Sequence, residues 1–167
     1  MPAARADLAV SLAGDGLARG ESLWVREGSR SMLPLIHPGE ELRLAPLDSR
    51  RIRRGGLIAY EREAQLVVHR VMAVTGSGVL AKGDALASPD PLVPWDRVVA
   101  RVVALRRPDG RLVDLEAFPW PLVDRLLAGI ASLAARLRLQ ERPNSPWRRL
   151  AWKALRVPFY LALLLLA

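Results

Sequence analysis

Residues 66–74 read LVVHRVMAV, a nearly continuous aliphatic run that one histidine and one arginine interrupt. Further short runs lie on either side of it between residues 22 and 114: SLWVRE, ELRLAP, LIAY, VLAK and RVVARVVAL. These runs are rich in Val, Leu and aromatic residues, which favour strands, and turn-forming segments such as HPGE, RRGG, TGSG and ASPDPLVP separate them. Because no helical pattern lies between the runs, the sequence predicts a mainly β fold of the sandwich or barrel-like type.

The pattern changes after Phe118, where apolar residues begin to recur at helical spacing. We therefore expect an N-terminal segment over residues 1–21, a β domain over residues 22–117 and an amphipathic helix over residues 118–140. Residues 141–167 form a basic tail, in which WRRLAWKALRV combines basic residues with tryptophans. That composition is typical of a helix at a membrane surface, and the alternative is a helix hairpin packed on the domain.

Charge separates the tail from the rest of the chain. From Pro121 onward eight Lys and Arg residues oppose two acidic ones, which accounts for +6 of the net charge of +8. No segment reaches the roughly 20 apolar residues that cross a bilayer, and the first 21 residues do not resemble a signal peptide. We expect peripheral membrane association through the tail, with the cytoplasmic face favoured, and no binding to nucleic acid because the tail also has an apolar side.

The composition narrows the possible chemistry. The chain of 167 residues is long enough for one domain with a proper core, and 51% of it is hydrophobic, which disfavours disorder. The absence of cysteine excludes disulfides, thiolate metal sites and a cysteine nucleophile. With only two histidines, a multi-histidine metal cage is impossible.

The segment REGSRSMLPLIHPGEEL, residues 26–42, contains a candidate nucleophile. Ser31 follows a predicted strand, with Gly28 freeing the backbone before it and Pro34 stiffening the exit. A serine hydroxyl needs a base near neutral pH, and histidine is the usual one. His69 lies in the aliphatic run and His37 in a turn, so each is a candidate base or simply a structural residue.

The segment AKGDALASPD, residues 81–90, supplies two carboxylates six residues apart, Asp84 and Asp90. Either could hold a histidine in the correct tautomer and stabilise its charged form, as in Ser-His-Asp hydrolases. The structural alternatives are an ordinary Gly-Asp turn for Asp84 and an Asp-Pro turn for Asp90. The sequence leaves the choice between the two acids open.

Taken in order, these segments resemble the type I signal peptidases, which share a superfamily with the self-cleaving repressors. The resemblance covers about residues 22–105, and it is closest to the Ser-His branch found in the endoplasmic reticulum and in archaea. It implies a mostly β catalytic domain that cleaves extended peptides after small residues, without a metal or cofactor. The expected partners are a peptide or preprotein substrate and the membrane surface.

The resemblance also implies roles for individual residues. Ser31 matches the nucleophile and His69 the general base. Apart from the resemblance, Lys82 and His37 are the alternative bases should cleavage depend on Ser31 and not on His69. Ser29 matches the residue whose hydroxyl forms the oxyanion hole together with the Ser31 amide. Asp84 matches the aspartate of a Gly-Asp pair, and Asp90 matches the acid assigned to the triad. Met32 and Pro34 match residues that shape the turn and the adjacent substrate groove.

The chain departs from the family pattern outside these groups. Pro38-Gly39-Glu40 and Gly55-Gly56 replace two Gly-Asp pairs, Ala85 replaces an asparagine, and the usual N-terminal membrane anchor is not apparent. Two alternatives to a signal-peptidase-like endopeptidase therefore stay open. One is a maturation protease for a small exported or modified peptide, and the other is a non-catalytic module that binds a membrane surface.

Overall fold

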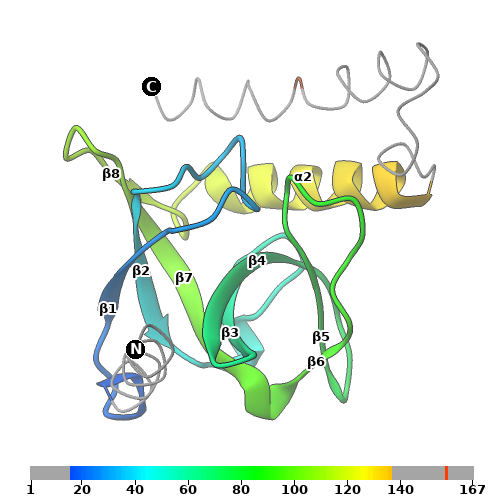
Figure 1. Ribbon diagram of the computed structural model, residues 1–167, viewed down its shortest axis with the longest axis horizontal. Coiled ribbons are helices and arrows are strands. Elements are labelled where there is room, and N and C mark those ends of the chain that lie inside the picture. The colour runs from blue at the N-terminus through cyan, green and yellow to red at the C-terminus, as the bar shows by residue number, and fades with distance from the viewer. Residues whose placement is uncertain (1–15, 137–156, 158–167) are drawn as a thin grey trace.

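The structure, a computed structural model, describes residues 16–136 and residue 157 (Figure 1). The described chain forms an eight-stranded sheet and one long helix, which confirms the predicted mainly β fold. The strands are β1 (Leu23–Arg26), β2 (Glu41–Pro46), β3 (Leu57–Arg62), β4 (Gln65–Val74), β5 (Gly78–Lys82), β6 (Val93–Pro94), β7 (Val98–Arg106) and β8 (Leu112–Asp114).

The strands pair throughout in antiparallel fashion, in the order β1-β2-β7-β3-β4-β5-β6, with β8 also on β7. The aliphatic run quoted first lies in β4, between β3 and β5. Each of the six runs identified in the sequence contains a strand. The additional strands β6 and β8 are only two and three residues long, too short to show a periodic pattern.

The sheet encloses two apolar clusters because successive side chains of a strand point to opposite faces. The larger cluster joins β2, β3, β7 and the loop after β1 to the helix, and it includes Met32, Leu42, Leu57 and Leu127. The smaller one lies within the curved β3–β5 part of the sheet and includes Ile58, Tyr60 and Val71. Register shifts at three strand pairs, between Arg43 and Leu44, Ala59 and Tyr60, and Val71 and Ala73, interrupt the regular pairing.

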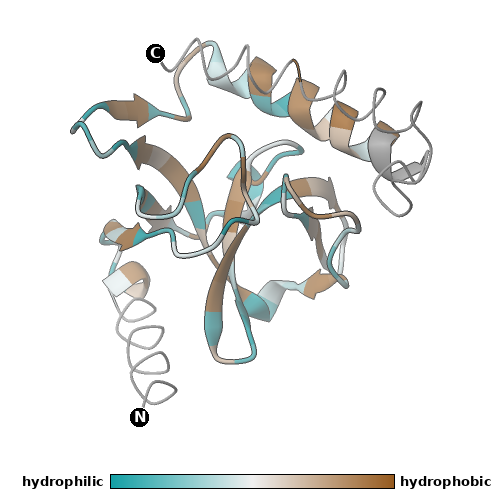
Figure 2. Cartoon of the chain, turned by 45° about the horizontal axis from the view of Figure 1, so that its top comes forward, coloured by the Kyte–Doolittle hydropathy of each residue, from teal (hydrophilic) through white to brown (hydrophobic). Residues whose placement is uncertain are grey.

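Helix α2 (Trp120–Arg136) lies across one side of the sheet. The helix is amphipathic, with hydrophobic and hydrophilic residues on different faces (Figure 2). It approaches the backbone before β3 so closely that a Cβ atom on Gly55 would lie 2.4 Å from the carbonyl carbon of Asp124. The outer face leaves several large apolar residues exposed: Leu122, Leu126 and Leu133. No helix among the described residues is both long and apolar enough to cross a bilayer.

The helix predicted over residues 118–140 thus begins at Trp120 and is described as far as Arg136. The remainder of that prediction, and the predicted basic membrane-associating helix in residues 141–167, lie outside the described residues, apart from Val157. The N-terminal segment, predicted over residues 1–21, is described only from residue 16.

Candidate active site

Ser31 lies in the loop between β1 and β2, residues 27–40, which we call the serine loop. The Ser31 amide donates a hydrogen bond to Ser29 Oγ at 3.2 Å, and the two hydroxyl oxygens lie 3.0 Å apart. Ser29 is in turn positioned because its own amide donates to Glu27 Oε1 at 2.7 Å. The loop therefore presents two neighbouring serine hydroxyls on a tightly hydrogen-bonded turn.

Buried acidic residues hold both ends of the serine loop together. The Glu27 amide donates to the Glu40 carbonyl oxygen at 2.8 Å, and the Gly39 amide donates back to the Glu27 carbonyl oxygen at 2.7 Å. The Glu40 carboxylate accepts a hydrogen bond from the His37 amide and forms an ion pair with Arg107. This bracing fixes the backbone that carries Ser31.

His69 reaches the serine loop from the middle of β4. It pairs in register with Ile58 of β3, so its ring lies at the edge of the smaller apolar cluster and is only 1% exposed. The Nε2 atom lies 3.1 Å from Ser31 Oγ. A histidine in this position can accept the serine proton, and its burial keeps competing water away from the ring.

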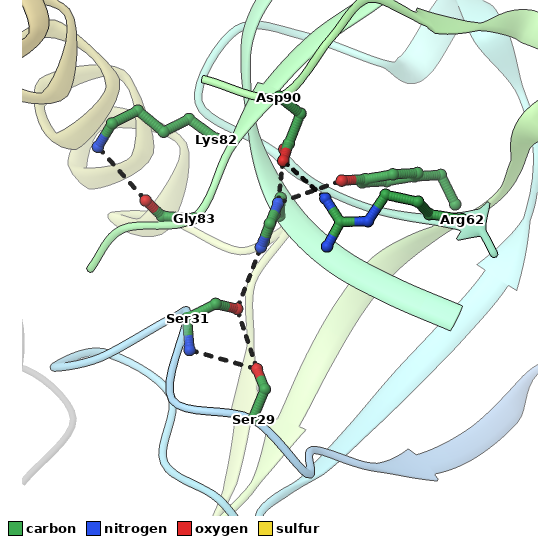
Figure 3. A network of polar contacts seen from close by, with 8 residues as sticks. Ser29, Ser31, Arg62, Lys82, Gly83 and Asp90 are labelled. Atoms are coloured by element: carbon green, nitrogen blue, oxygen red, sulfur yellow. Dashed lines mark hydrogen bonds and ion pairs between the residues drawn. The ribbon is translucent and has the colours of Figure 1, made fainter. Parts of the chain in front are cut away.

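Asp90 completes a chain of three groups, shown in Figure 3. Its Oδ2 atom lies 2.6 Å from His69 Nδ1. An ionised carboxylate only accepts hydrogen bonds, so Nδ1 carries the proton and donates it toward Asp90. That tautomer leaves Nε2 as an acceptor for the hydroxyl proton of Ser31.

Two further residues surround the carboxylate of Asp90. Arg62 Nη1 donates to Asp90 Oδ1 at 3.0 Å, and the Tyr60 hydroxyl lies 3.3 Å from His69 Nδ1. Burial and the neighbouring charge of Asp90 raise the pKa of Tyr60, so its phenol stays protonated and remains a donor. Burial alone would raise the pKa of Asp90, but hydrogen bonding and charge from His69, with Tyr60 and Arg62, lower it overall.

Asp84 has a different partner from Asp90. Its two carboxylate oxygens accept two hydrogen bonds of 2.8 Å from the Arg70 guanidinium, and Arg70 also donates to Asp124 Oδ1 on α2 at 2.7 Å. Burial opposes the charge of Arg70, but Asp84 and Asp124 raise its pKa further, so it stays charged. Of the two acids left open by the sequence, the structure places Asp90 on His69 and Asp84 on Arg70.

The Asp84–Arg70 pair holds a loop that contacts Ser31. In this loop, residues 83–92, the Ala85 amide donates to the Ser31 carbonyl oxygen at 2.8 Å. Gly83 packs so tightly that a Cβ atom there would lie 2.8 Å from the Ser31 carbonyl oxygen and 2.9 Å from His69 Nε2. Asp84 therefore helps to position Ser31 and His69 indirectly, through this loop.

The remaining predicted residues lie in varied settings. Met32 is 0% exposed within the larger cluster, and Pro34 is buried, so both support the serine loop from below. Their expected part in shaping the adjacent substrate groove stays a prediction. The two substitute bases are not beside Ser31: His37 is half exposed next to Glu40, and Lys82 donates to the Gly83 carbonyl oxygen.

Sequence reasoning did not identify several residues of this site: Tyr60, Arg62, Arg70, Gly83 and Asp124. Tyr60 and Arg62 could have been predicted from the sequence, because they occupy every second position after Ile58 and so share its face of the strand that pairs with His69. Asp124 had none, since its contact with Arg70 joins positions 54 residues apart. Within the described residues no group of His, Asp and Glu is arranged to hold a metal ion.

Comparisons with known proteins assign neither a family nor a function to this site. The chain matches no protein-family model, and no curated protein is significantly similar to it. The function proposed below therefore rests on the side chains themselves.

Proposed function

We propose that the protein is a serine endopeptidase that uses Ser31, His69 and Asp90. The observation that carries the proposal is the continuous chain from Ser31 Oγ to His69 Nε2, at 3.1 Å, and from His69 Nδ1 to Asp90, at 2.6 Å. A histidine on the surface would need neither a serine nor a carboxylate as a hydrogen-bond partner. His69 is almost fully buried between the partly exposed Ser31 and the carboxylate of Asp90, and this is the geometry that activates a serine as a nucleophile.

The proposed reaction begins when Ser31 Oγ attacks the scissile carbonyl carbon while its proton passes to His69 Nε2. Asp90 stabilises the resulting imidazolium through its hydrogen bond to Nδ1. His69 then returns the proton to the leaving amine as the C–N bond breaks, which gives an ester on Ser31. Water, deprotonated by His69, hydrolyses this ester and restores the serine.

The oxyanion of the tetrahedral intermediate would bind at the Ser31 amide and the Ser29 hydroxyl. The amide already points at Ser29 Oγ, 3.2 Å away, so the two donors border one small region beside Ser31 Oγ. Removing one such donor typically costs about 10²–10³ in rate. We therefore propose Ser29 as a further catalytic residue, beside Ser31, His69 and Asp90.

The substrate proposal follows the resemblance to type I signal peptidases described above. It implies an extended peptide with small residues, often alanine, at the first and third positions before the cleaved bond. A maturation protease for a small exported or modified peptide would use the same chemistry on a narrower substrate. Both versions need the same catalytic chain, so they differ in peptide preference only.

We further propose that the protein associates with a membrane surface. The sequence of the basic tail motivated this expectation, and the outer face of α2 adds to it. Leu122 and Leu126 lie four residues apart on the exposed face of α2, and Phe118, just before the helix, is 83% exposed. An apolar stripe next to a strongly basic segment is the pattern of an interfacial helix. Co-sedimentation with anionic phospholipid vesicles, weakened by Leu122→Ser and Leu126→Ser together, would support this proposal.

The protease proposal is tested by digestion of a peptide mixture containing Ala-x-Ala sites, with detergent present and mass spectrometry as the readout. We expect the wild type to cleave these peptides and both Ser31→Ala and His69→Ala to lose cleavage. His37→Ala and Ser77→Ala are matched controls, because both residues are exposed and lie outside the catalytic chain. Their cleavage rates should equal that of the wild type.

Two results would contradict the proposal. One is cleavage that survives in Ser31→Ala, which would place the nucleophile elsewhere. The other is the absence of cleavage in the wild type across a peptide library of diverse sequence, which would favour the membrane-surface binding module.

A further inference from the structure

Lys82, at the end of β5, is a buried cation that the proposed reaction does not use. It pairs in register with Arg70 of β4, so both side chains point to the face of the sheet opposite His69. Figure 3 shows Lys82 directed away from Ser31 and toward helix α2. The residue is only 1% exposed, which is rare for lysine.

The ammonium group of Lys82 has little direct compensation from the described residues. Nζ donates to the Gly83 carbonyl oxygen at 3.3 Å. The two nearest acids are engaged elsewhere, since Asp84 binds Arg70 and Asp90 binds His69 and Arg62. Desolvation lowers the pKa of Lys82, although the charges of Asp84 and Asp90 oppose this. A buried ammonium in this setting is stabilised by an additional anionic partner.

A cavity of about 320 Å³ opens beside Lys82, between the β4–β5 strands and α2. Apolar side chains of Met72, Leu80 and Pro89 form much of its wall, and Ser132 contributes from the helix. Arg54 stands at the exposed side, where its Nη2 donates to Ser132 Oγ at 3.0 Å. The volume is at the lower end of the roughly 300–1,000 Å³ of small-molecule sites.

We propose that this cavity binds a small aliphatic carboxylate. The carboxylate would accept hydrogen bonds from Lys82 at the buried end and from Arg54 near the opening. The aliphatic body would lie against Met72, Leu80 and Pro89, which a hydrated phosphate would leave uncovered. The size of the cavity fits a short chain and excludes a long acyl chain. This site is separate from the catalytic chain.

Isothermal titration calorimetry with three probes tests the proposal: hexanoate, 1-hexanol and inorganic phosphate. Hexanol has the same chain without the charge, so we expect hexanoate to bind at least about tenfold more tightly than hexanol, because a buried charge-assisted hydrogen bond is lost. Phosphate should bind more weakly than hexanoate. N-acetyl-leucine in a fourth titration distinguishes a peptide C-terminus from a free fatty acid as the source of the carboxylate.

Variants then locate the binding site. Lys82→Met keeps the length of the side chain but removes its charge, and we expect it to lose hexanoate binding by at least about tenfold. Arg97→Met, which removes an exposed arginine beside Glu61, should bind as the wild type does. Should Lys82→Met fail to fold, as judged by circular dichroism, Arg54→Gln and Leu80→Phe test the opening and the apolar wall, and each should weaken binding.

Three results would overturn the proposal: no saturable binding of hexanoate, equal affinity for hexanoate and hexanol, or unchanged affinity in the variants at the cavity. Tighter binding of phosphate would also reject the carboxylate class. The Ser31→Ala variant should bind hexanoate normally. The result of the hexanoate titration is therefore independent of whether the protein is a protease.

Discussion

The carboxylate of Asp90 decides which nitrogen of His69 carries the proton. An ionised Asp90 accepts from Nδ1 at 2.6 Å, which leaves Nε2 free to accept the proton of Ser31. An amide at position 90 can instead donate to Nδ1 and so stabilise the unproductive tautomer. We therefore expect Asp90→Asn to lower kcat by about 10³–10⁴-fold with little change in KM.

Steady-state kinetics on a peptide that the wild type cleaves would measure this effect. Asp96→Asn is the control, because Asp96 is exposed and follows β6, away from the catalytic chain. A fall in kcat of less than tenfold in Asp90→Asn would mean that the acid contributes to structure and not to catalysis.

The lowered pKa of Asp90 also predicts how stability depends on pH. In the unfolded chain an aspartate titrates near pH 3.9, and in the folded protein its partners lower that pKa. The folded state thus favours the ionised form, so this contribution to stability is present above the unfolded pKa and is lost as pH falls through the folded one. We expect the difference in unfolding free energy between wild type and Asp90→Asn to shrink below about pH 4.

Urea unfolding at a series of pH values would measure that difference. Asp96→Asn should show no comparable change against the wild type over the same range. A difference that stays constant or grows as the solution becomes more acidic would show that His69 and Arg62 do not stabilise the ionised form of Asp90.

Individual residues of the site differ in how far the sequence revealed them. Ser31, His69 and Asp90 were predicted because the segments that contain them resemble, in order, those of the type I signal peptidases. The residues alone did not distinguish Asp84 from Asp90, since both follow turn residues in one loop. That distinction depends on Arg70, whose guanidinium engages both oxygens of Asp84.

At the level of elements, the loop after β5 packs against both Ser31 and His69, the proposed nucleophile and its proposed base. Gly83 lies against both the Ser31 carbonyl oxygen and His69 Nε2, where a Cβ atom would make contacts of 2.8 and 2.9 Å. Neither neighbour is the far end of a flexible side chain, so the methyl group of alanine would displace the serine loop or the imidazole. A displacement of about 1 Å can cost about 10² in rate.

We therefore expect Gly83→Ala to lower kcat by about 100-fold or more while the protein stays folded. Gly76→Ala is the matched control, because a Cβ atom there meets nothing within 4 Å and its backbone is not left-handed. Kinetic assays together with circular dichroism would distinguish a loss of activity from a loss of folded structure. Equal activity of the two variants would contradict the role of this close approach.

The strands were more predictable than the connections between them. The run in β4 carries enough Val and Leu to indicate a strand from its composition, and β2 matches the expected ELRLAP segment residue for residue. The order β1-β2-β7-β3-β4-β5-β6 follows from contacts between distant strands. Composition does not encode those contacts, which also bring the serine loop and residues 83–92 together.

On the scale of the whole molecule, Arg70 connects helix α2 to the loop that contacts Ser31. Its guanidinium donates at one end to Asp124 of the helix and at the other to Asp84, and it also donates to the Gly55 carbonyl oxygen at 2.7 Å. All three side chains are buried. The helix is therefore held to the sheet by charge as well as by Leu127 and its apolar neighbours.

Removing one member of this buried network should destabilise the fold, because the remaining charge loses a partner that water cannot replace. We expect Asp124→Leu to lower the unfolding free energy by about 3 kcal/mol, and Asp96→Leu, an exposed control, to change it by no more than about 0.5 kcal/mol. Urea denaturation followed by circular dichroism would give both values. The double variant Arg70→Met with Asp124→Leu should lose less than the sum of the single losses, since the second substitution removes a contact already broken. Additive losses would show that Arg70 and Asp124 are neighbours without energetic coupling, and α2 would then be held by apolar packing alone.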